Sequence, residues 1–213
     1  MSHDRSVICL CGALAGGKTT LVRRLSVALD GASILLFDDY EAFGEWPEDM
    51  RAWLAEGCDP SRVRVPRLRQ DLEALLDGLP VKHPLDEHEI RPSRVLLVED
   101  PFGRTRPDIR ALYDVVLYID LPPDLGVVRM AQRALGLGFD GGDKTIDTLS
   151  RNDLAERVRA ADRWLTSYTA LRDMYTDLAE PVRASADAIL DGRQSPEVLA
   201  EAALAAIREH GIA

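Results

Sequence analysis

Short apolar runs alternate with segments of helical periodicity along most of the chain. Runs of three to five apolar residues, each suited to a buried strand, occupy 7–11, 34–37, 95–98, 115–119 and 188–190. Apolar residues spaced by three or four predict helices over 18–29, 66–76 and about 154–175, and a last helix between Ser195 and Gly211. Strands that are apolar on both faces favour a parallel sheet covered by helices. We therefore expect an α/β fold, a three-layer sandwich around a central, mostly parallel five-stranded sheet, with a small lid.

The length of the chain fits a single domain. With 213 residues it is long enough for one α/β domain and short for two. No internal repeat, low-complexity tract or linker interrupts it, so we expect one domain over 1–213. The segment 135–149 is rich in glycine and charge, and with the helix before it predicts a lid around 129–149. A passive surface loop fits the composition of 135–149 equally well.

The net charge of the chain limits which binding partners are expected. The net charge is −10, from 26 basic and 36 acidic residues, which argues against broad binding to nucleic acid or to an anionic membrane. No apolar run has membrane-spanning length, and no signal-peptide pattern precedes the first strand, so a cytoplasmic location is the expectation. The three cysteines have no metal-ligand spacing and are expected to be buried thiols.

The most specific motif lies between the first strand and the first helix. The sequence GALAGGKT, from Gly12 to Thr19, matches G-x-x-x-x-G-K-[ST], a loop whose backbone N–H groups and following helix N-terminus hold phosphates. The expected three-layer sandwich is therefore of the P-loop NTPase type. Lys18 is expected to reach the β- and γ-phosphates of ATP or a related triphosphate, and Thr19 to ligate Mg²⁺. The expected nucleotide-binding residues are Gly12, Ala13, Ala15, Gly16, Gly17, Lys18, Thr19 and Thr20.

Acidic pairs follow two of the predicted strands. Asp38 and Asp39 follow the second strand, and Glu99 and Asp100 follow the third. Since ligands of a parallel sheet bind at the carboxyl ends of its strands, one acid is expected to hold Mg²⁺ and another to accept a proton from an attacking hydroxyl. We assign Glu99 to the metal and Asp38 to the proton. Asp100 is the alternative for the metal, and Asp39 the alternative for the proton.

One four-residue pattern after the third predicted strand is also found in GTPases. Asp100-Pro101-Phe102-Gly103 has the D-x-x-G form of a GTPase switch, but the chain has no N-K-x-D motif to read guanine. The four-letter match alone is weak support for a GTPase.

Several further segments occur in a recognisable order. These are Asp38-Asp39-Tyr40; 72–78 followed by 81–86, similar to L-x-x-G-x-x-V-x-x-P-x-Y-D; Val98-Glu99; 124–133; and the sequence ADAILDG at 186–192. Together with the phosphate loop they resemble the uridine kinase family and its relatives, nicotinamide riboside kinase, phosphoribulokinase and the bacterial pantothenate kinases. The resemblance runs from about Cys9 to Gly192.

The resemblance implies roles for individual residues. It makes Asp38 the base and Glu99 the strand-end glutamate, and it places Arg129 and Arg133 among the lid arginines. It sets the acceptor near the 81–86 stretch, with His88 and Arg91 soon after. Leu85 stands where uridine kinases have a tyrosine against the nucleoside, which argues against assuming uridine itself. The candidate acceptor-binding residues are Asp39, Tyr40, His83, His88, Arg91 and Arg104.

The function predicted from these features is a small-molecule kinase. It would use ATP and Mg²⁺ to phosphorylate a hydroxyl of a nucleoside, sugar or vitamin precursor, with Lys18, Asp38, Arg129 and Arg133 as catalytic residues. Its partners would be ATP and the acceptor, with no nucleic acid and no membrane, and no oligomeric state is predicted. Two alternatives stay open: a P-loop hydrolase that uses water as acceptor, and a nucleotide-binding regulatory module.

Overall fold

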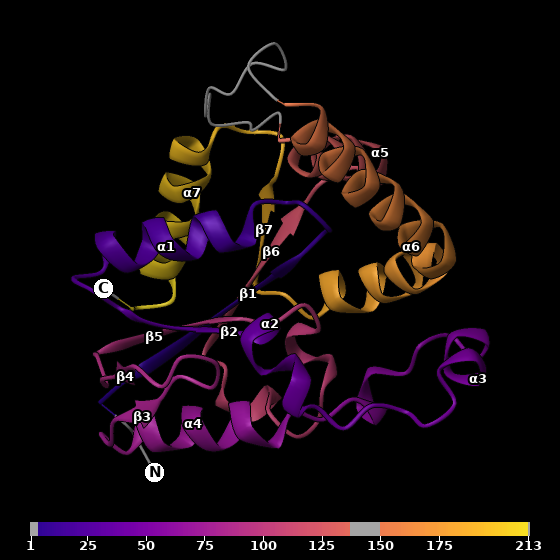
Figure 1. Ribbon diagram of the computed structural model, residues 1–213. Coiled ribbons are helices and arrows are strands. Elements are labelled where there is room, and N and C mark those ends of the chain that lie inside the picture. The colour runs from indigo at the N-terminus through magenta and orange to yellow at the C-terminus, as the bar shows by residue number, and fades with distance from the viewer. Residues whose placement is uncertain (1–3, 137–149, 213) are drawn as a thin grey trace.

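A five-stranded parallel sheet forms the centre of the computed structural model, which describes residues 4–136 and 150–212 (Figure 1). The strand order is β2-β5-β1-β6-β7, as expected for the predicted α/β fold. The strands of this sheet are β1 (Ser6–Gly12), β2 (Ser33–Leu36), β5 (Val95–Glu99), β6 (Val115–Asp120) and β7 (Ala188–Asp191). A separate antiparallel pair consists of β3 (Val81–Lys82) and β4 (Glu89–Ile90).

Helices cover both faces of the sheet, with α1 and α7 on one side and α4 on the other (Figure 1). Their bounds are α1 (Lys18–Ala28), α2 (Phe37–Tyr40), α3 (Met50–Ala55), α4 (Pro66–Leu76), α5 (Pro123–Ala134), α6 (Arg151–Ala184) and α7 (Pro196–Glu209). Successive side chains of β1 point to opposite faces of the sheet, so this strand contributes to the core on each face. Ile8 packs in the cluster with Leu21 and Ile207, whereas Cys9 packs in the cluster with Leu72. The three-layer arrangement predicted from the sequence is confirmed.

The second strand ends one residue earlier than predicted. The apolar run continues to Phe37, but the strand ends at Leu36 and Phe37 begins the short helix α2. The ring of Phe37 packs edge-on against Phe102, with centroids 5.5 Å apart, and is buried in the core below α2. Asp38 and Asp39 therefore lie in the first turn of a helix instead of at a strand end.

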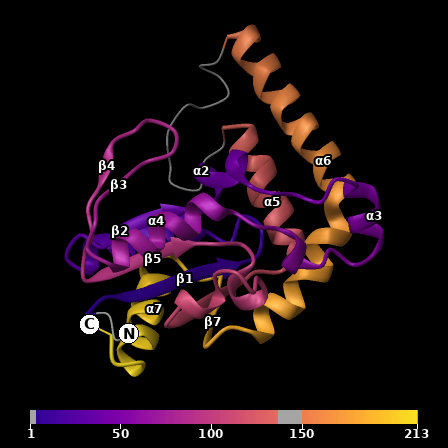
Figure 2. The ribbon, with the colours of Figure 1, turned by 90° about the horizontal axis from the view of Figure 1, so that it is seen from below.

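The long helix α6 buries less of its apolar face than its periodicity predicts. Leu154, Val158 and Leu165 are exposed, and Tyr168 and Tyr175 are half-buried instead of forming a core face. These side chains are not buried because the N-terminal half of α6 runs beside α5 and projects beyond the sheet (Figure 2). In the part of the chain that the structure describes, no helix combines the length and apolar character needed to cross a membrane. Of the predicted lid, 129–136 is described and 137–149 lies outside the described residues.

Candidate active site

The phosphate loop is fixed to the end of β6 by backbone contacts. Ala13 N–H donates to the carbonyl of Ile119 at 3.0 Å. Gly12 has φ 134°, and a Cβ at this position would lie 2.4 Å from the Ile119 carbonyl oxygen, so a side chain is sterically excluded. Gly17 caps α1 in the left-handed region at φ 93°. The loop thus holds its shape because backbone approaches backbone where only glycine fits.

Two side chains of the motif point to the mouth of the loop. Lys18 Nζ donates to the carbonyls of Gly12 and Ala13, each at 3.2 Å, which holds the ammonium over the loop. Thr19 Oγ1 donates to Glu99 Oε2 at 2.8 Å. Glu99 ends β5, which pairs with β1 on one side and β2 on the other. The threonine and the strand-end glutamate predicted to share a metal are therefore in contact.

Glu99 and its neighbour Asp100 lie in different environments. Burial raises the pKa of Glu99, while Lys18 and the Thr19 hydroxyl oppose that rise. Asp100 is fully buried and faces the core, where it accepts from Arg106 Nη2 at 2.6 Å and from the hydroxyl of Tyr113 at 2.7 Å. This geometry favours Glu99 over Asp100 as the metal ligand. It also gives Asp100 a structural role instead of that of a GTPase switch.

The helix α2 brings two carboxylates to Glu99. Leu36 pairs with Glu99 in the register of β2 and β5, so α2 begins beside the metal-ligand candidate. The charges of Asp38 and Asp39 both contribute to raising the pKa of Glu99. The side chain of Asp38 is exposed, whereas that of Asp39 is half-buried and lies 3.2 Å from His83 Nε2. The two candidate bases thus differ in surroundings, with Asp38 the more accessible to a substrate.

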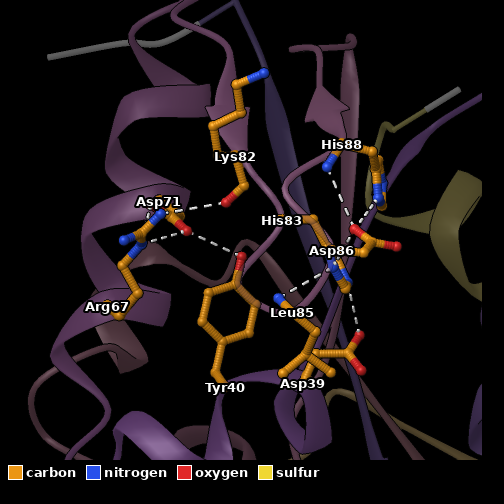
Figure 3. A network of polar contacts seen from close by, with 9 residues as sticks. All are labelled: Asp39, Tyr40, Arg67, Asp71, Lys82, His83, Leu85, Asp86 and His88. Atoms are coloured by element: carbon orange, nitrogen blue, oxygen red, sulfur yellow. Dashed lines mark hydrogen bonds and ion pairs between the residues drawn. The ribbon is translucent and has the colours of Figure 1, made fainter.

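A buried network that the sequence did not predict anchors α2 to α4 (Figure 3). The hydroxyl of Tyr40 donates to Asp71 at 3.1 Å, and Arg67 Nε donates to the same carboxylate at 2.9 Å. Arg67 Nη2 also donates to the Lys82 carbonyl of β3 at 3.2 Å. Burial raises the pKa of Tyr40 far above its usual range, so its hydroxyl stays a donor. The available signal was Asp71 itself, a carboxylate at helical spacing from Leu68 on the apolar face of α4.

The other predicted acceptor residues divide into two groups. His83 and His88 lie at the tip of the β3–β4 hairpin, and His83 faces Asp39 (Figure 3). Arg91 is highly exposed and pairs with Glu89, and its carbonyl accepts from Ser33 at the amino end of β2. Arg104 is bound to Asp187 and to the carbonyl of Asp114, which precede β7 and β6. The structure therefore does not bring Arg91 or Arg104 to the carboxyl edge where the acceptor residues meet.

The helix α5 lies against the phosphate loop. Arg129 Nη1 is 3.5 Å from the Ala15 carbonyl, and Arg133, one turn later, is exposed. Gly126 permits this approach, because a Cβ there would lie 2.8 Å from the carbonyl oxygen of Leu14. Both arginines were predictable from the sequence, but the role of Gly126 was not, since a single glycine in a helical pattern gives no sign of what it faces.

Comparison with known proteins shows which sequences the chain resembles. No family model matches the chain. The uridine kinase of Shewanella piezotolerans is 26% identical over 86% of this chain and 86% of its own, and that of Bacillus subtilis is 24% identical over 89% and 87%. The chain is thus similar to the uridine kinases over most of its length. A solved structure described as a possible uridine kinase from Bacillus stearothermophilus is 20% identical, covers 90% of this chain and 91% of its own, and has a TM-score of 0.47.

This likeness supports the class of reaction predicted from the sequence. The relatives are named as kinases, in agreement with the prediction of a small-molecule kinase that transfers phosphate to a hydroxyl. The predicted fold class, the resemblance and the general activity are therefore confirmed.

Proposed function

We propose that this kinase binds ATP with Mg²⁺ on the loop Gly12–Thr19 and phosphorylates a hydroxyl of a nucleoside, sugar or vitamin-precursor type of acceptor. The observation that carries the proposal is the contact between Thr19 and Glu99, 2.8 Å apart, beside the carboxylates of α2. The proposal is supported by the position of the loop Gly12–Thr19, of Glu99 and of α2, which all follow the carboxyl ends of neighbouring strands, the edge at which parallel sheets bind ligands.

The residues present fit a magnesium ion. Mg²⁺ takes oxygen ligands at 2.0–2.1 Å in octahedral geometry, so two adjacent ligands lie about 2.9 Å apart. Thr19 Oγ1 and Glu99 Oε2 already have nearly this separation. When bound, Mg²⁺ neutralises charge on the β- and γ-phosphates. Thr19 and Glu99 are the residues that we assign to it.

The protein's own side chains carry the rest of the proposed mechanism. Asp38 accepts a hydrogen bond from the acceptor hydroxyl, orients it toward the γ-phosphate and removes its proton late in the transfer. Lys18 and Arg129 stabilise negative charge on the transferring group, with Arg133 joining from the next turn of α5. We assign Asp39 and Tyr40 to the wall behind the acceptor, since His83 and Asp71 hold their side chains in place.

The acceptor is not assigned as uridine, although the relatives are named uridine kinases. Leu85, which replaces the tyrosine that those kinases pack on the nucleoside, is 61% exposed at the hairpin tip. A flexible aliphatic side chain at this place offers no ring for stacking on a base. The proposed acceptor is therefore the wider class of nucleosides, sugars and vitamin precursors.

A ligand screen tests the proposal. Nucleosides, sugars and vitamin precursors are added in turn to the protein with Mg²⁺ and a non-hydrolysable ATP analogue, and thermal unfolding is followed. A true acceptor at 100 times its Kd should add about 2.7 kcal/mol to the free energy of unfolding. Each hit is then tested for acceptor-dependent ADP formation. Absence of any acceptor dependence, with ATP turnover unchanged throughout the panel, contradicts the proposal.

A further inference from the structure

Three potential metal ligands meet at the tip of the β3–β4 hairpin. The ligand atoms offered by His83, Asp86 and His88 lie within 4.8 Å of one another. His83 N–H donates to the His88 carbonyl at 2.9 Å, so the two histidines face each other across the hairpin. Their rings stack with centroids 4.6 Å apart and an interplanar angle of 21°. Asp86, in the loop between them, folds back onto both rings (Figure 3).

The contacts of Asp86 require a proton or a metal ion between its carboxylate and each histidine ring. Asp86 Oδ1 lies 2.9 Å from His83 Nδ1 and 2.6 Å from His88 Nδ1. A carboxylate oxygen repels the lone pair of a neutral imidazole nitrogen at such distances, and a proton or a metal ion between them removes the repulsion.

The surroundings of the two ring nitrogens of His83 indicate which nitrogen carries the proton and which one offers its lone pair to the cluster. Asp39 Oδ2 lies 3.2 Å from His83 Nε2, and the N–H of Leu85 points at His83 Nδ1 from 3.4 Å. Together these contacts assign the proton of His83 to Nε2 and the lone pair to Nδ1. A histidine that donates its far N–H to a carboxylate is the usual arrangement of a metal-bound imidazole. Asp39 has the geometry of that supporting carboxylate.

We propose that His83, Asp86 and His88 bind one divalent transition-metal ion of the zinc type, and that Asp39 is a positioning residue that orients the His83 ring. Two imidazoles and a carboxylate suit Zn²⁺, Co²⁺ or Ni²⁺, whereas Mg²⁺ prefers oxygen ligands alone. This site is separate from the one that Thr19 and Glu99 provide, and the inference does not depend on the kinase reaction.

The hairpin can adopt the required geometry with small side-chain movements. Bond lengths of 2.0–2.1 Å in a tetrahedral zinc site place neighbouring ligand atoms about 3.3 Å apart. The present separations from Asp86 are 2.6 and 2.9 Å, and the side chains of Asp86 and His88 are 65% and 58% exposed. They are therefore free to move outward by the roughly 0.4–0.7 Å needed, while the ligand nitrogens of the two histidines, at most 4.8 Å apart, approach each other toward about 3.3 Å. A bound ion would join the hairpin tip, through His83 and Asp39, to the helix that carries Asp38.

Metal binding by the full-length, tag-free, EDTA-treated protein without nucleotide tests this proposal. Co²⁺ is titrated while its visible absorption is followed, and Zn²⁺ binding is measured by calorimetry. One ion per chain is expected. Asp86→Asn and His88→Ala should each weaken binding at least roughly tenfold, and Asp39→Asn roughly tenfold, as is usual for loss of a ligand-supporting partner.

Glu87→Gln is the matched control, because it removes the same charge from the adjacent exposed residue of the loop. Its affinity for the metal ion should differ from that of the wild type by less than about twofold, whereas Asp39→Asn should weaken binding roughly tenfold. Circular dichroism confirms that each variant is folded. The proposal is overturned if the wild type binds neither ion at one per chain, if Asp86→Asn and His88→Ala bind as the wild type does, or if Glu87→Gln causes an equal loss. Unchanged binding by Asp39→Asn refutes its positioning role.

Discussion

The two sides of the candidate active site are held together by different kinds of contact. The phosphate loop is built from backbone: Ala13 donates to Ile119, and glycines allow approaches that any Cβ would block. The acceptor side is built from side chains that are far apart in the sequence. Tyr40 reaches Asp71 across 31 positions, and Asp39 reaches His83 across 44.

This difference indicates how each side should respond to mutation. Loss of a side chain from the phosphate loop removes chemistry but leaves the backbone scaffold in place. Loss of a side chain from the acceptor side removes a contact between elements, so stability and the position of α2 change together. The predictions below test this contrast.

Lys18→Ala should have the largest effect. Lys18 is the cation of the loop and acts on charge that develops during transfer, so turnover should fall by roughly 10²- to 10³-fold. The melting temperature should change little. Arg23→Ala, which removes one exposed positive charge from the same helix, is the control and should keep near-normal turnover. Steady-state ADP formation measures both, and near-normal activity of folded Lys18→Ala contradicts the role of the loop.

Asp38→Asn should keep its affinity for ATP and lose kcat by roughly 10²-fold, a typical effect of removing a general base. Asp39→Asn should be milder, because its carboxylate contacts His83 instead of facing solvent. The comparison of kcat between the two variants decides between them. If Asp39→Asn is the inactive variant and Asp38→Asn is active, the base is Asp39.

Gly126→Ala should act on the phosphate loop from outside the motif. Its Cβ would lie 2.8 Å from the Leu14 carbonyl oxygen, so α5 must move and carry Arg129 away from Ala15. We expect a destabilisation of about 1–3 kcal/mol, as for other overpacked contacts, and roughly tenfold lower kcat, equivalent to about 1.4 kcal/mol. A double-mutant cycle with Arg129→Gln checks the cause. Fully additive losses in kcat would show that Gly126 does not act through Arg129.

Two ion pairs on α4 test the acceptor side by stability. Asp71 and Glu73 each pair with an arginine four residues earlier at 2.9 Å, but Asp71 is buried and also accepts from Tyr40, whereas the side chain of Glu73 is 42% exposed. Asp71→Ala should cost about 1–3 kcal/mol by leaving buried donors without an acceptor. Glu73→Ala should cost about 0.5 kcal/mol or less. Urea unfolding measures both, and equal losses would remove the case for a buried anchor of α2.

Glu99→Gln should alter the pH dependence of stability of the protein without ligands. Burial raises the pKa of Glu99, so the folded state holds the proton to a higher pH than the unfolded state does. The stabilising contribution is full below the ordinary glutamate pKa of about 4.3 and is lost as pH rises through the folded value. The melting temperature of the wild type relative to Glu99→Gln should therefore decrease as pH rises above about 4.3. A difference that is constant with pH, or that grows, is inconsistent with this assignment.

The same contrast explains how much of the molecule could be predicted from sequence. The strands, the main helices and the loop Gly12–Thr19 are local patterns, so composition and spacing identified them. The hairpin β3–β4 has two residues in each strand, too few for periodicity to show. Three other features depend on which elements meet in three dimensions. These are the Asp71 network, the close approach of α5 to the phosphate loop at Gly126, and the position of Arg104 away from the carboxyl edge of the sheet. None of these is encoded in a short stretch of sequence.

The fate of the γ-phosphate tests the central claim most directly. ³¹P NMR of the wild-type protein with ATP, Mg²⁺ and an acceptor found by the ligand screen reports all phosphorus-containing products at once. The account predicts ADP and a phosphate ester of the acceptor in equal amounts, with no product when the acceptor is left out. ADP with inorganic phosphate at a rate independent of the acceptor would instead identify a hydrolase, and no turnover with any acceptor would identify a nucleotide-binding module.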